Sequence, residues 1–335
     1  MIVLLGKRKL VVIVIVLLIC LGFIGLIFLT NRGNGQETIM MGTHILEQDL
    51  SIFDQDTTVN QTNNKNKNRR SVKSDEQYFR PSKRPSINQN FNSHFFDTYA
   101  EKKPSDFEIP TELLKTPEET IVNYFSVLRE GENLTTEQSG GCGTVGQSKI
   151  PYPVAYNFFT NGYQKEVSYE TYLGSFKGIG HINLLKVKEV PSKKQNKYFI
   201  EFETIEGSSK GGTYFGYYFG FVYLDNQGKT YKISEKELYS QDFLCAAYHG
   251  WEHHAEAYVD IKYGGWCNLI EKRYATIEDD FVKKVPFKGV DGNDYMIMFF
   301  ELTNGTDIEI AQYKRNNEDK WIQVMLSPEK CLSTD

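Results

Sequence analysis

The sequence lacks the short motifs by which many enzymes are recognised. It contains no Gly-x-Ser-x-Gly elbow, no phosphate-binding loop and no dinucleotide-binding glycine pattern, which mark serine hydrolases, nucleotide hydrolases and Rossmann oxidoreductases. It also lacks a basic surplus, because 38 Lys and Arg residues stand against 43 Asp and Glu residues for a net charge of −5. Since nucleic-acid binders usually carry a basic domain, we expect no nucleic-acid partner. Because the cofactor-binding motifs are missing, we expect no cofactor either.

Cysteine is scarce, and its five positions divide unevenly. Cys20 lies inside an N-terminal hydrophobic run, whereas Cys142, Cys245, Cys267 and Cys331 all follow it. In an oxidising compartment four cysteines allow three disulfide connectivities. The alternative is a set of unpaired or partly paired thiols.

The only long hydrophobic run covers residues 10–29, and it contains neither charge nor proline. Twenty apolar residues match the roughly 30 Å hydrocarbon core of a bilayer, so we predict a transmembrane anchor at 10–30. Lys7, Arg8 and Lys9 precede it, and such residues favour the cytoplasmic side. The prediction is a single-pass protein of the cell membrane, with residues 1–9 in the cytoplasm and the C-terminal bulk outside the cell.

Two alternatives to this anchor stay open. The first is a signal peptide that is removed, although secretory hydrophobic regions are usually about 7–15 residues long and no small-x-small cleavage site follows here. The second is a lipoprotein, which needs a small residue before Cys20, where the chain has the bulky Ile19. N-terminal sequencing of the mature protein distinguishes the three.

Residues 31–115 form a polar, Asn-rich and basic stretch, which we predict to be a disordered linker. Between residues 61 and 103, ten Lys or Arg stand against four Asp or Glu, and no hydrophobic period offsets the entropy lost on ordering. One interpretation is a tether that contacts anionic lipid or an anionic wall polymer, at about 1 kcal/mol per basic residue. The other is a solvated spacer. The aromatic patch Phe91, Phe95, Phe96 and Tyr99 docks either on the folded part or on a partner.

The folded sequence begins near Thr116, where Thr-Pro-Glu-Glu is typical of a helix start. Apolar residues recur at helical spacing up to Gly131, and short helices are expected at 153–159 and 168–176. Segments rich in β-branched and aromatic residues, separated by turn residues, then predict four strands at 181–190, 197–206, 213–224 and 230–234.

The same order of elements is repeated further along the chain. A helix is expected at 254–261, and four strands follow at 281–288, 294–303, 306–313 and 320–326. Segment 197–202 resembles 294–299, and the turn at 225–229 resembles that at 316–320. We therefore predict an α+β fold with two related domains, at 116–245 and 246–335, each with helices and a curved antiparallel sheet.

The leading Thr-Pro-Glu-Glu-Thr helix, the small helices and the meander resemble the nuclear transport factor 2-like superfamily, from residue 116 to about 240. The resemblance implies a cone of sheet and helices that holds a small molecule or mediates association, often without catalysis. Isomerase-like members need an acid or base inside the cone, for which Asp225, Glu201 and Glu203 are available. Because Glu201 and Glu203 alternate with Phe202, we expect these two carboxylates to face solvent.

The tethered arrangement is similar to conjugation-channel components and small envelope proteins of Gram-positive bacteria, and the Asn- and Lys-rich composition is typical of such a source. The resemblance implies an extracytoplasmic binding or assembly protein with a protein partner in an envelope complex of the secretion or conjugation type. It does not imply an enzyme.

An alternating aromatic stripe marks the third predicted strand, at Phe215, Tyr217, Phe219, Phe221 and Tyr223. Alternate residues of a strand share one face, so the stripe lines either an apolar ligand pocket or a filled core. Core is the commoner use of such stripes, and the glycines on the opposite face mark bends or close packing.

A histidine cluster offers the alternative function of a membrane-anchored metal-dependent hydrolase. His249, Glu252 and His253 have the spacing H-x-x-E-H, which on a helix places both histidines on one face for a metal and the glutamate beside them as a base. Gly250 weakens such a helix. A His-rich helix start or an interdomain contact is the competing interpretation.

The repeat also predicts the disulfides, because each copy ends in a cysteine and has another after its first helix. The expected bonds are Cys142–Cys245 and Cys267–Cys331, each worth about 2–4 kcal/mol of stability. Peptide mapping of the unreduced protein should recover both pairs. A Cys142–Cys267 or Cys245–Cys267 bond would contradict the repeat.

Overall fold

The computed structural model describes residues 82, 84–100, 102, 107–140, 148–192, 195–241 and 250–333. All of these belong to one compact unit, Ile39–Asp335. The predicted anchor at 10–30, most of the predicted linker, Cys142, Cys245 and His249 lie outside the described residues. Within the described ranges the fold is α+β with antiparallel sheets, and no helix there is long and apolar enough to span a membrane.

The first sheet is a four-stranded antiparallel meander in the order β1-β2-β3-β4. Its strands are β1 (Ile179–Val190), β2 (Asn196–Gly207), β3 (Thr213–Asn226) and β4 (Tyr231–Ser240). The four predicted strands are confirmed, and β4 continues six residues beyond its predicted end at 234. The β3–β4 turn uses Gly228 at φ +86°, a left-handed conformation that glycine adopts without strain.

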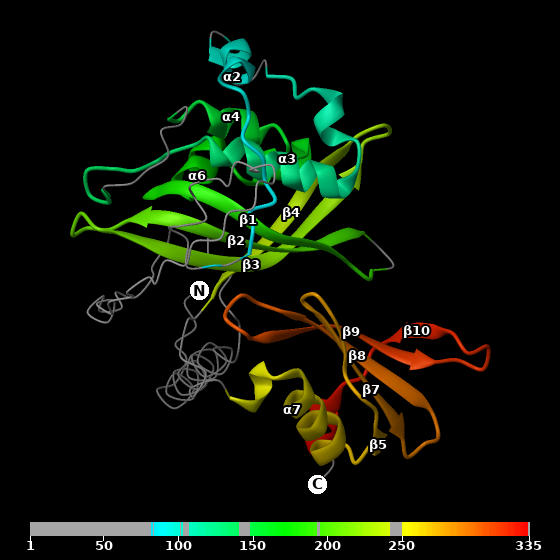
Figure 1. Cartoon of the computed structure of the whole chain (residues 1–335). Helices are drawn as coiled ribbons and strands as arrows, with labels where there is room; N and C mark the ends of the chain where they lie inside the picture. Colours follow the sequence, from blue (N-terminus) through cyan, green and yellow to red (C-terminus); the bar gives the residue numbers. More distant parts are fainter. Residues whose placement is uncertain are drawn as a thin grey trace, which may run out of the picture. The chain divides into compact units, whose positions relative to one another are not determined.

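Short helices cover one face of this sheet (Figure 1). They are α3 (Pro117–Arg129), α4 (Pro151–Tyr156), α5 (Asn161–Glu166) and α6 (Tyr169–Gly174). As the sequence predicts, Thr116 caps α3, and its hydroxyl oxygen accepts the Glu119 backbone N–H at 3.2 Å. Thr160 and Ser168 cap α5 and α6 in the same way, so each of these three helices has a defined start.

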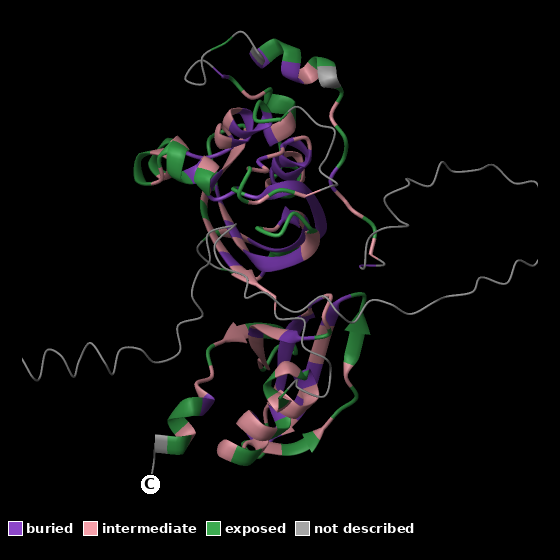
Figure 2. Ribbon diagram, turned by 90° about the vertical axis from the view of Figure 1, so that its left-hand side faces the viewer, coloured by how far each residue is buried: buried purple, intermediate pink, exposed green. Residues whose placement is uncertain are grey.

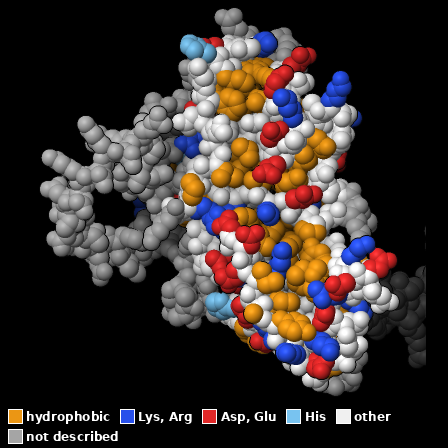
Figure 3. All heavy atoms as spheres, turned by 45° about the vertical axis from the view of Figure 1, so that its right-hand side comes forward, with side chains coloured by type: hydrophobic (Ala, Val, Ile, Leu, Met, Phe, Trp, Pro, Cys, Tyr) orange, Lys and Arg blue, Asp and Glu red, His pale blue; other side chains and the backbone are white. Residues whose placement is uncertain are grey.

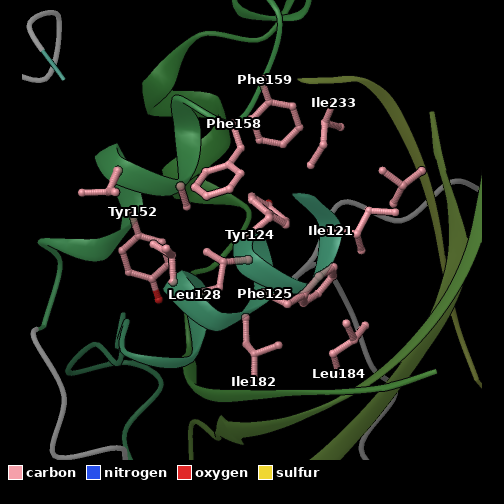
Figure 4. Close-up of a cluster of buried hydrophobic side chains, with 14 of the residues drawn as sticks. Ile121, Tyr124, Phe125, Leu128, Tyr152, Phe158, Phe159, Ile182, Leu184 and Ile233 are labelled. Atoms are coloured by element: carbon pink, nitrogen blue, oxygen red, sulfur yellow. The ribbon is translucent and has the colours of Figure 1, made fainter. Parts of the chain in front are cut away.

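The main core lies between α3 and the helix-facing side of the sheet (Figure 4). From α3, Ile121, Phe125 and Leu128 point toward Ile182 and Leu184 of β1, and all five are fully buried. Each such side chain contributes about 1.5–3 kcal/mol of burial free energy. Figure 2 shows the same distribution, with buried residues on the strands and on the helix faces turned to them.

The segment before α3 belongs to this folded part, which corrects the predicted linker boundary at residue 115. It contains α2 (Ser93–Ala100) and the 3-10 helix η3 (Thr111–Leu114). Phe96 and Tyr99 are buried in the main core, and Phe91 and Phe95 pack against it. The aromatic patch therefore docks on the folded part. Its rings bury apolar surface there, although the composition of the whole stretch is polar.

The second sheet has the strand order β10-β9-β8-β7-β5, with β6 also paired to β7. The four predicted strands are present as β7 (Val282–Gly289), β8 (Asp294–Glu301), β9 (Asp307–Arg315) and β10 (Trp321–Val324). The short strands β5 (Ile270–Arg273) and β6 (Ile277–Asp279) were not predicted. The meander order β7 to β10 thus matches that of β1 to β4, but its strands are shorter.

A short helical layer and a disulfide complete the second sheet. The 3-10 helix η5 (Trp251–His253) is followed by α7 (Ala255–Val259) and the π-helix η6 (Asp260–Trp266), where one α-helix was predicted. Apolar residues of α7 and η6 pack on β7 and β8. The predicted Cys267–Cys331 disulfide is present, with an S–S distance of 2.08 Å, and joins the end of η6 to the C-terminal 3-10 helix η7 (Pro328–Ser333).

Replacing Asn88 by alanine should destabilise the protein, because this buried side chain joins the segment before α3 to two other elements. Its amide donates to the Phe125 and Ile182 carbonyls at 3.1 and 3.0 Å, and its oxygen accepts the Leu184 N–H at 2.9 Å. We expect Asn88→Ala to lower the free energy of unfolding by about 2–4 kcal/mol in denaturant titrations.

The matched control is Gln89→Ala, because Gln89 is exposed and its backbone N–H keeps its bond to Ser126 Oγ. The control should change stability by less than about 0.5 kcal/mol. Equal effects of the two substitutions would contradict the placement of this segment in the folded part.

Candidate functional site

The aromatic stripe predicted as a ligand pocket lies on the face of β3 opposite to the helices. Phe219 is buried in an apolar cluster with Phe199 of β2, Phe281 of the β6–β7 turn and Phe300 of β8. The ring centroids of Phe199 and Phe300 are 5.2 Å apart. This part of the stripe therefore serves as core between the sheets. The pocket role of the stripe stays a prediction.

Phe215 is half-buried, and the other three stripe residues combine with polar groups. The Tyr217 hydroxyl donates to Glu203 at 2.5 Å, the Tyr223 hydroxyl donates to Glu237 at 3.1 Å, and Lys197 Nζ lies 3.9 Å from the Phe221 ring centroid. A purely apolar lining is thus absent from this stretch of β3.

The expectation that Glu201 and Glu203 face solvent is wrong, because both are fully buried on the stripe's side of the sheet. Glu201 forms an ion pair with Lys186 at 2.6 Å and accepts the Thr303 N–H at 2.7 Å and the Gln241 amide at 2.6 Å. A buried carboxylate with these three partners stabilises the fold, because removing any one partner leaves a buried charge or polar group without its interaction. These carboxylates lie on the side away from the helices, so they do not act inside the predicted cone.

A different lysine lies on the helix-covered face of the sheet. Lys236 of β4 pairs in register with Val222 of β3, which is part of the main core. Its ammonium nitrogen lies 5.3 Å from the Tyr172 ring centroid, 5.5 Å from that of Phe159 and 5.7 Å from that of Phe176. We call these four residues the Lys236 cluster.

The three rings of the Lys236 cluster are fixed by their own packing. Each is at most 1% exposed. Phe176 and Tyr172 pack edge to face at 5.0 Å, and Tyr163 stacks on Phe159 at 4.2 Å. The Tyr172 and Tyr124 hydroxyls are 3.3 Å apart. The lysine therefore meets a rigid aromatic surface, supplied by α6 and by the segments that follow α4 and α6.

No carboxylate neutralises Lys236 among the described residues, where its side chain has no ion pair and no hydrogen bond. Burial alone lowers the pKa of Lys236 to about 8. The contrast with the other buried amines is clear, because Lys186 pairs with Glu201, and Lys283 pairs with Glu301 and Asp307. Cation–π attraction, about 0.5–2 kcal/mol per good contact, offsets only part of the lost hydration.

The arrangement leaves Lys236 with two chemical capacities. The residue as a whole is half-buried, and its ammonium nitrogen lies among three buried aromatic rings. As an ammonium it attracts an anion, and as a free amine it is a nucleophile at pH values above about 8. An uncompensated lysine with a strongly shifted pKa on an enclosed face is a candidate for function rather than for stability.

The histidine cluster does not have the helical geometry that its spacing assumes. Gly250 has an extended backbone, with ψ 170°, and η5 covers only three residues before α7 begins at Ala255. His249 lies outside the described residues. Within the described ranges no group of three or more His, Cys, Asp or Glu residues is arranged to hold a metal, and the role of His253 in metal binding stays a prediction.

The residue pattern of β4 does not reveal the Lys236 cluster, because this strand contains a bulge. Leu224 pairs with Ile233 and Tyr223 with Glu235, so Ser234 is an extra residue. Regular alternation from Ile233 places residues 235 and 237 toward the helices, whereas the bulge brings Lys236 there instead.

No protein-family model, curated protein or solved structure gives a significant match to this chain.

Replacing Lys236 by methionine should stabilise the protein at neutral pH, in a pH-dependent way. Below pH 8 the lysine is charged in the folded and unfolded states, and the full penalty of burying the charge is present. As pH rises from about 8 toward 10.5 the folded state loses the proton first, so the penalty disappears. We expect Lys236→Met to raise the free energy of unfolding at pH 7 by about 1–2 kcal/mol, less than full conversion of the shift because the side chain still contacts water.

The measurement is a series of denaturant titrations between pH 7 and pH 10.5. The control is Lys229→Met, since Lys229 is exposed in the β3–β4 turn and its removal should produce no comparable trend. A stabilisation that stays constant or grows with pH would contradict the assignment.

Proposed function

We propose that this chain is a single-pass, membrane-anchored binding or assembly protein that acts outside the membrane without catalysing a reaction. The observation that carries the proposal is the Lys236 cluster, because a lysine with no carboxylate partner among the described residues destabilises the fold, a cost that binding sites commonly carry. The hydrophobic run at residues 10–29 supports the anchor, and Lys7, Arg8 and Lys9 support the outward orientation.

The proposed architecture is a pair of related cone-like domains of the nuclear transport factor 2-like kind. In support, α3 leads into small helices and a meander in the first domain, and α7 precedes a meander of the same order in the second. In this proposal the helix-covered face of the first sheet, rather than the aromatic stripe of β3, is the ligand side of the cone.

The proposed partners are the membrane and a protein of an envelope complex of the secretion or conjugation type. On the face drawn in Figure 3, acidic and basic side chains are interspersed among the hydrophobic ones. Such a mixed surface does not favour binding of a polyanion, so we assign any contact with anionic lipid or wall polymer to the basic stretch between residues 61 and 103.

Labelling of intact cells with a membrane-impermeant amine-acylating reagent tests this proposal. We expect mass spectrometry to find acylation of the exposed Lys320 and of Lys236 before the cells are opened. Lys7 and Lys9 should react only after lysis, and N-terminal sequencing should show that the anchor is retained. Zinc analysis of the purified protein serves as the test of the metal-hydrolase alternative.

Protection of Lys320 with labelling of Lys7 would reverse the proposed orientation. Labelling of Lys320 without Lys236 would show that the Lys236 cluster is closed to ligands. Either result overturns the proposed function, and stoichiometric zinc that is lost in His253→Ala would replace it with the metal-hydrolase alternative.

A further inference from the structure

We infer that β10 (Trp321–Val324) pairs edge to edge with β10 of a second copy of this chain, so that two second sheets join across a two-fold axis. This pairing goes beyond the proposed function and does not depend on the Lys236 cluster. It follows from three features of β10: its open outer edge, the apolar side chains along that edge, and the fit of the edge to itself.

The outer edge of β10 presents backbone groups that point away from the sheet. Among the described strands β10 pairs with β9 alone, and Figure 1 shows it at the end of the second sheet. The Asn316 N–H donates to the Lys320 carbonyl at 2.9 Å, so Lys320 belongs to a hydrogen-bonded pair with β9. Since such pairs alternate along an antiparallel ladder, the N–H and C=O groups of Trp321 and Gln323 point outward. They form a row to which a further strand can bind.

The side chains along this edge are apolar and exposed. Neither a charged residue nor a proline occurs from Trp321 to Leu326. The exposed fractions are 36% for Trp321, 45% for Ile322 and 91% for Met325. Trp321 and Ile322 lie on opposite faces, because successive strand residues alternate. Natural proteins protect their sheet edges with charges, prolines or a covering segment, so an edge that is apolar on both faces indicates an interface.

The other sheet edges within the described ranges have such protection. On β1 the Leu184 carbonyl accepts the Ile87 N–H at 2.9 Å, so the segment before α3 covers part of that edge. On β4 the Ile233 carbonyl accepts the Thr160 N–H at 2.8 Å. The opposite edge of the second sheet, formed by β5 and β6, carries the charged residues Glu271, Lys272, Arg273, Glu278 and Asp279. β10 differs from all three.

The edge of β10 is complementary to a second copy of itself. Antiparallel pairing that places Gln323 opposite Gln323 of the second copy uses the outward backbone groups of both strands. It sets Trp321 opposite Met325 and Ile322 opposite Val324, and the two-fold axis makes each of these contacts twice. Every exposed apolar residue of the edge then has an apolar neighbour at a cross-strand distance of about 4.5–5.5 Å.

Charge and exposure favour a second copy over an extended peptide of another protein. In the same register Lys320 lies opposite Leu326, so no charged residue meets one of like sign. Peptides that add to a sheet edge usually place their side chains in pockets. Here Ile322 and Met325 are themselves the exposed groups, and the second copy supplies an apolar surface that covers them. The pairing involves few residues, and interfaces below about 1,000 Å² are weak, so we expect a reversible dimer.

Sedimentation velocity on the full-length chain in a nonionic detergent tests the inference across a range of protein concentrations. We expect a monomer–dimer equilibrium for the wild-type chain. Ile322→Glu should weaken it by about tenfold or more, because it places a carboxylate against an apolar neighbour of the second copy. The matched control is Val290→Glu, since Val290 is 64% exposed but lies in the β7–β8 turn. The control should leave the equilibrium unchanged, and thermal unfolding of both variants should match the wild type.

Disulfide trapping gives a second readout, which reports the register. In the inferred pairing the Cα atoms of the two copies of Gln323 are about 5.5 Å apart, which is within the range of a disulfide. Gln323→Cys should therefore form a covalent dimer on mild oxidation, and peptide mapping should find residue 323 bonded to itself. Lys320→Cys should form much less, because its two copies lie about 20 Å apart in this register.

Three results would overturn the inference: a wild-type chain that stays monomeric at every concentration, a dimer that Ile322→Glu leaves unchanged, or a Gln323→Cys chain that traps no more dimer than Lys320→Cys. Trapping of Gln323→Cys on a different protein in intact cells would assign the edge to another partner's strand and would also contradict it. Neither the acylation of Lys236 nor the zinc content enters these experiments, so the dimer can fail while the proposed function stands.

Discussion

Burial of β2 on both of its faces is the constraint on which the rest of the structure depends. Ile200 and Phe202 face the helix-covered core, and Phe199 faces the cluster shared with the second sheet. A strand buried on both sides has no solvent to accept its polar residues, so Glu201 requires Lys186 from β1 and the Thr303 N–H from beyond β8. The first sheet thus forms a central layer with an apolar partner on each side.

The buried amines show how differently charge is treated on the two sides of this layer. On the side of the second sheet, Lys186 and Lys283 each have carboxylate partners, and the pKa of Lys283 rises to about 12 through Glu301 and Asp307. On the helix side, the ammonium of Lys236 meets aromatic rings and no carboxylate among the residues that the structure describes. The first arrangement fixes structure, because breaking either pair leaves a buried charge. The second leaves a charge available to a ligand.

Much of the fold could be predicted from the sequence, because strand and helix patterns depend on local residue order. The four strands of each meander and the Thr116 cap were predicted, and so was the Cys267–Cys331 bond. Predictions failed where distant segments decide the environment. The alternation of Glu201 with Phe202 shows that the two residues lie on opposite faces of the strand. It does not show that a second sheet covers the face of Glu201, and the prediction that Glu201 faces solvent was therefore wrong.

The candidate site itself was not predictable. One extra residue at Ser234 exchanges the two faces of β4, and no local pattern marks this bulge. The segment before α3 was predicted to be disordered for a related reason. Its overall composition is polar, but a few aromatic rings and the Asn88 amide attach it to the core.

That attachment also determines how mechanical load enters the protein. Arg84 donates to both carboxylate oxygens of Asp280 in the β6–β7 turn, at 3.1 and 2.7 Å, and the Ile87 N–H donates to the Leu184 carbonyl of β1 at 2.9 Å. Tension applied to the chain from the side of residue 82 meets the second sheet first and the first sheet a few residues later. Both contacts precede α2 in the chain, so both have to break before such a load reaches that helix.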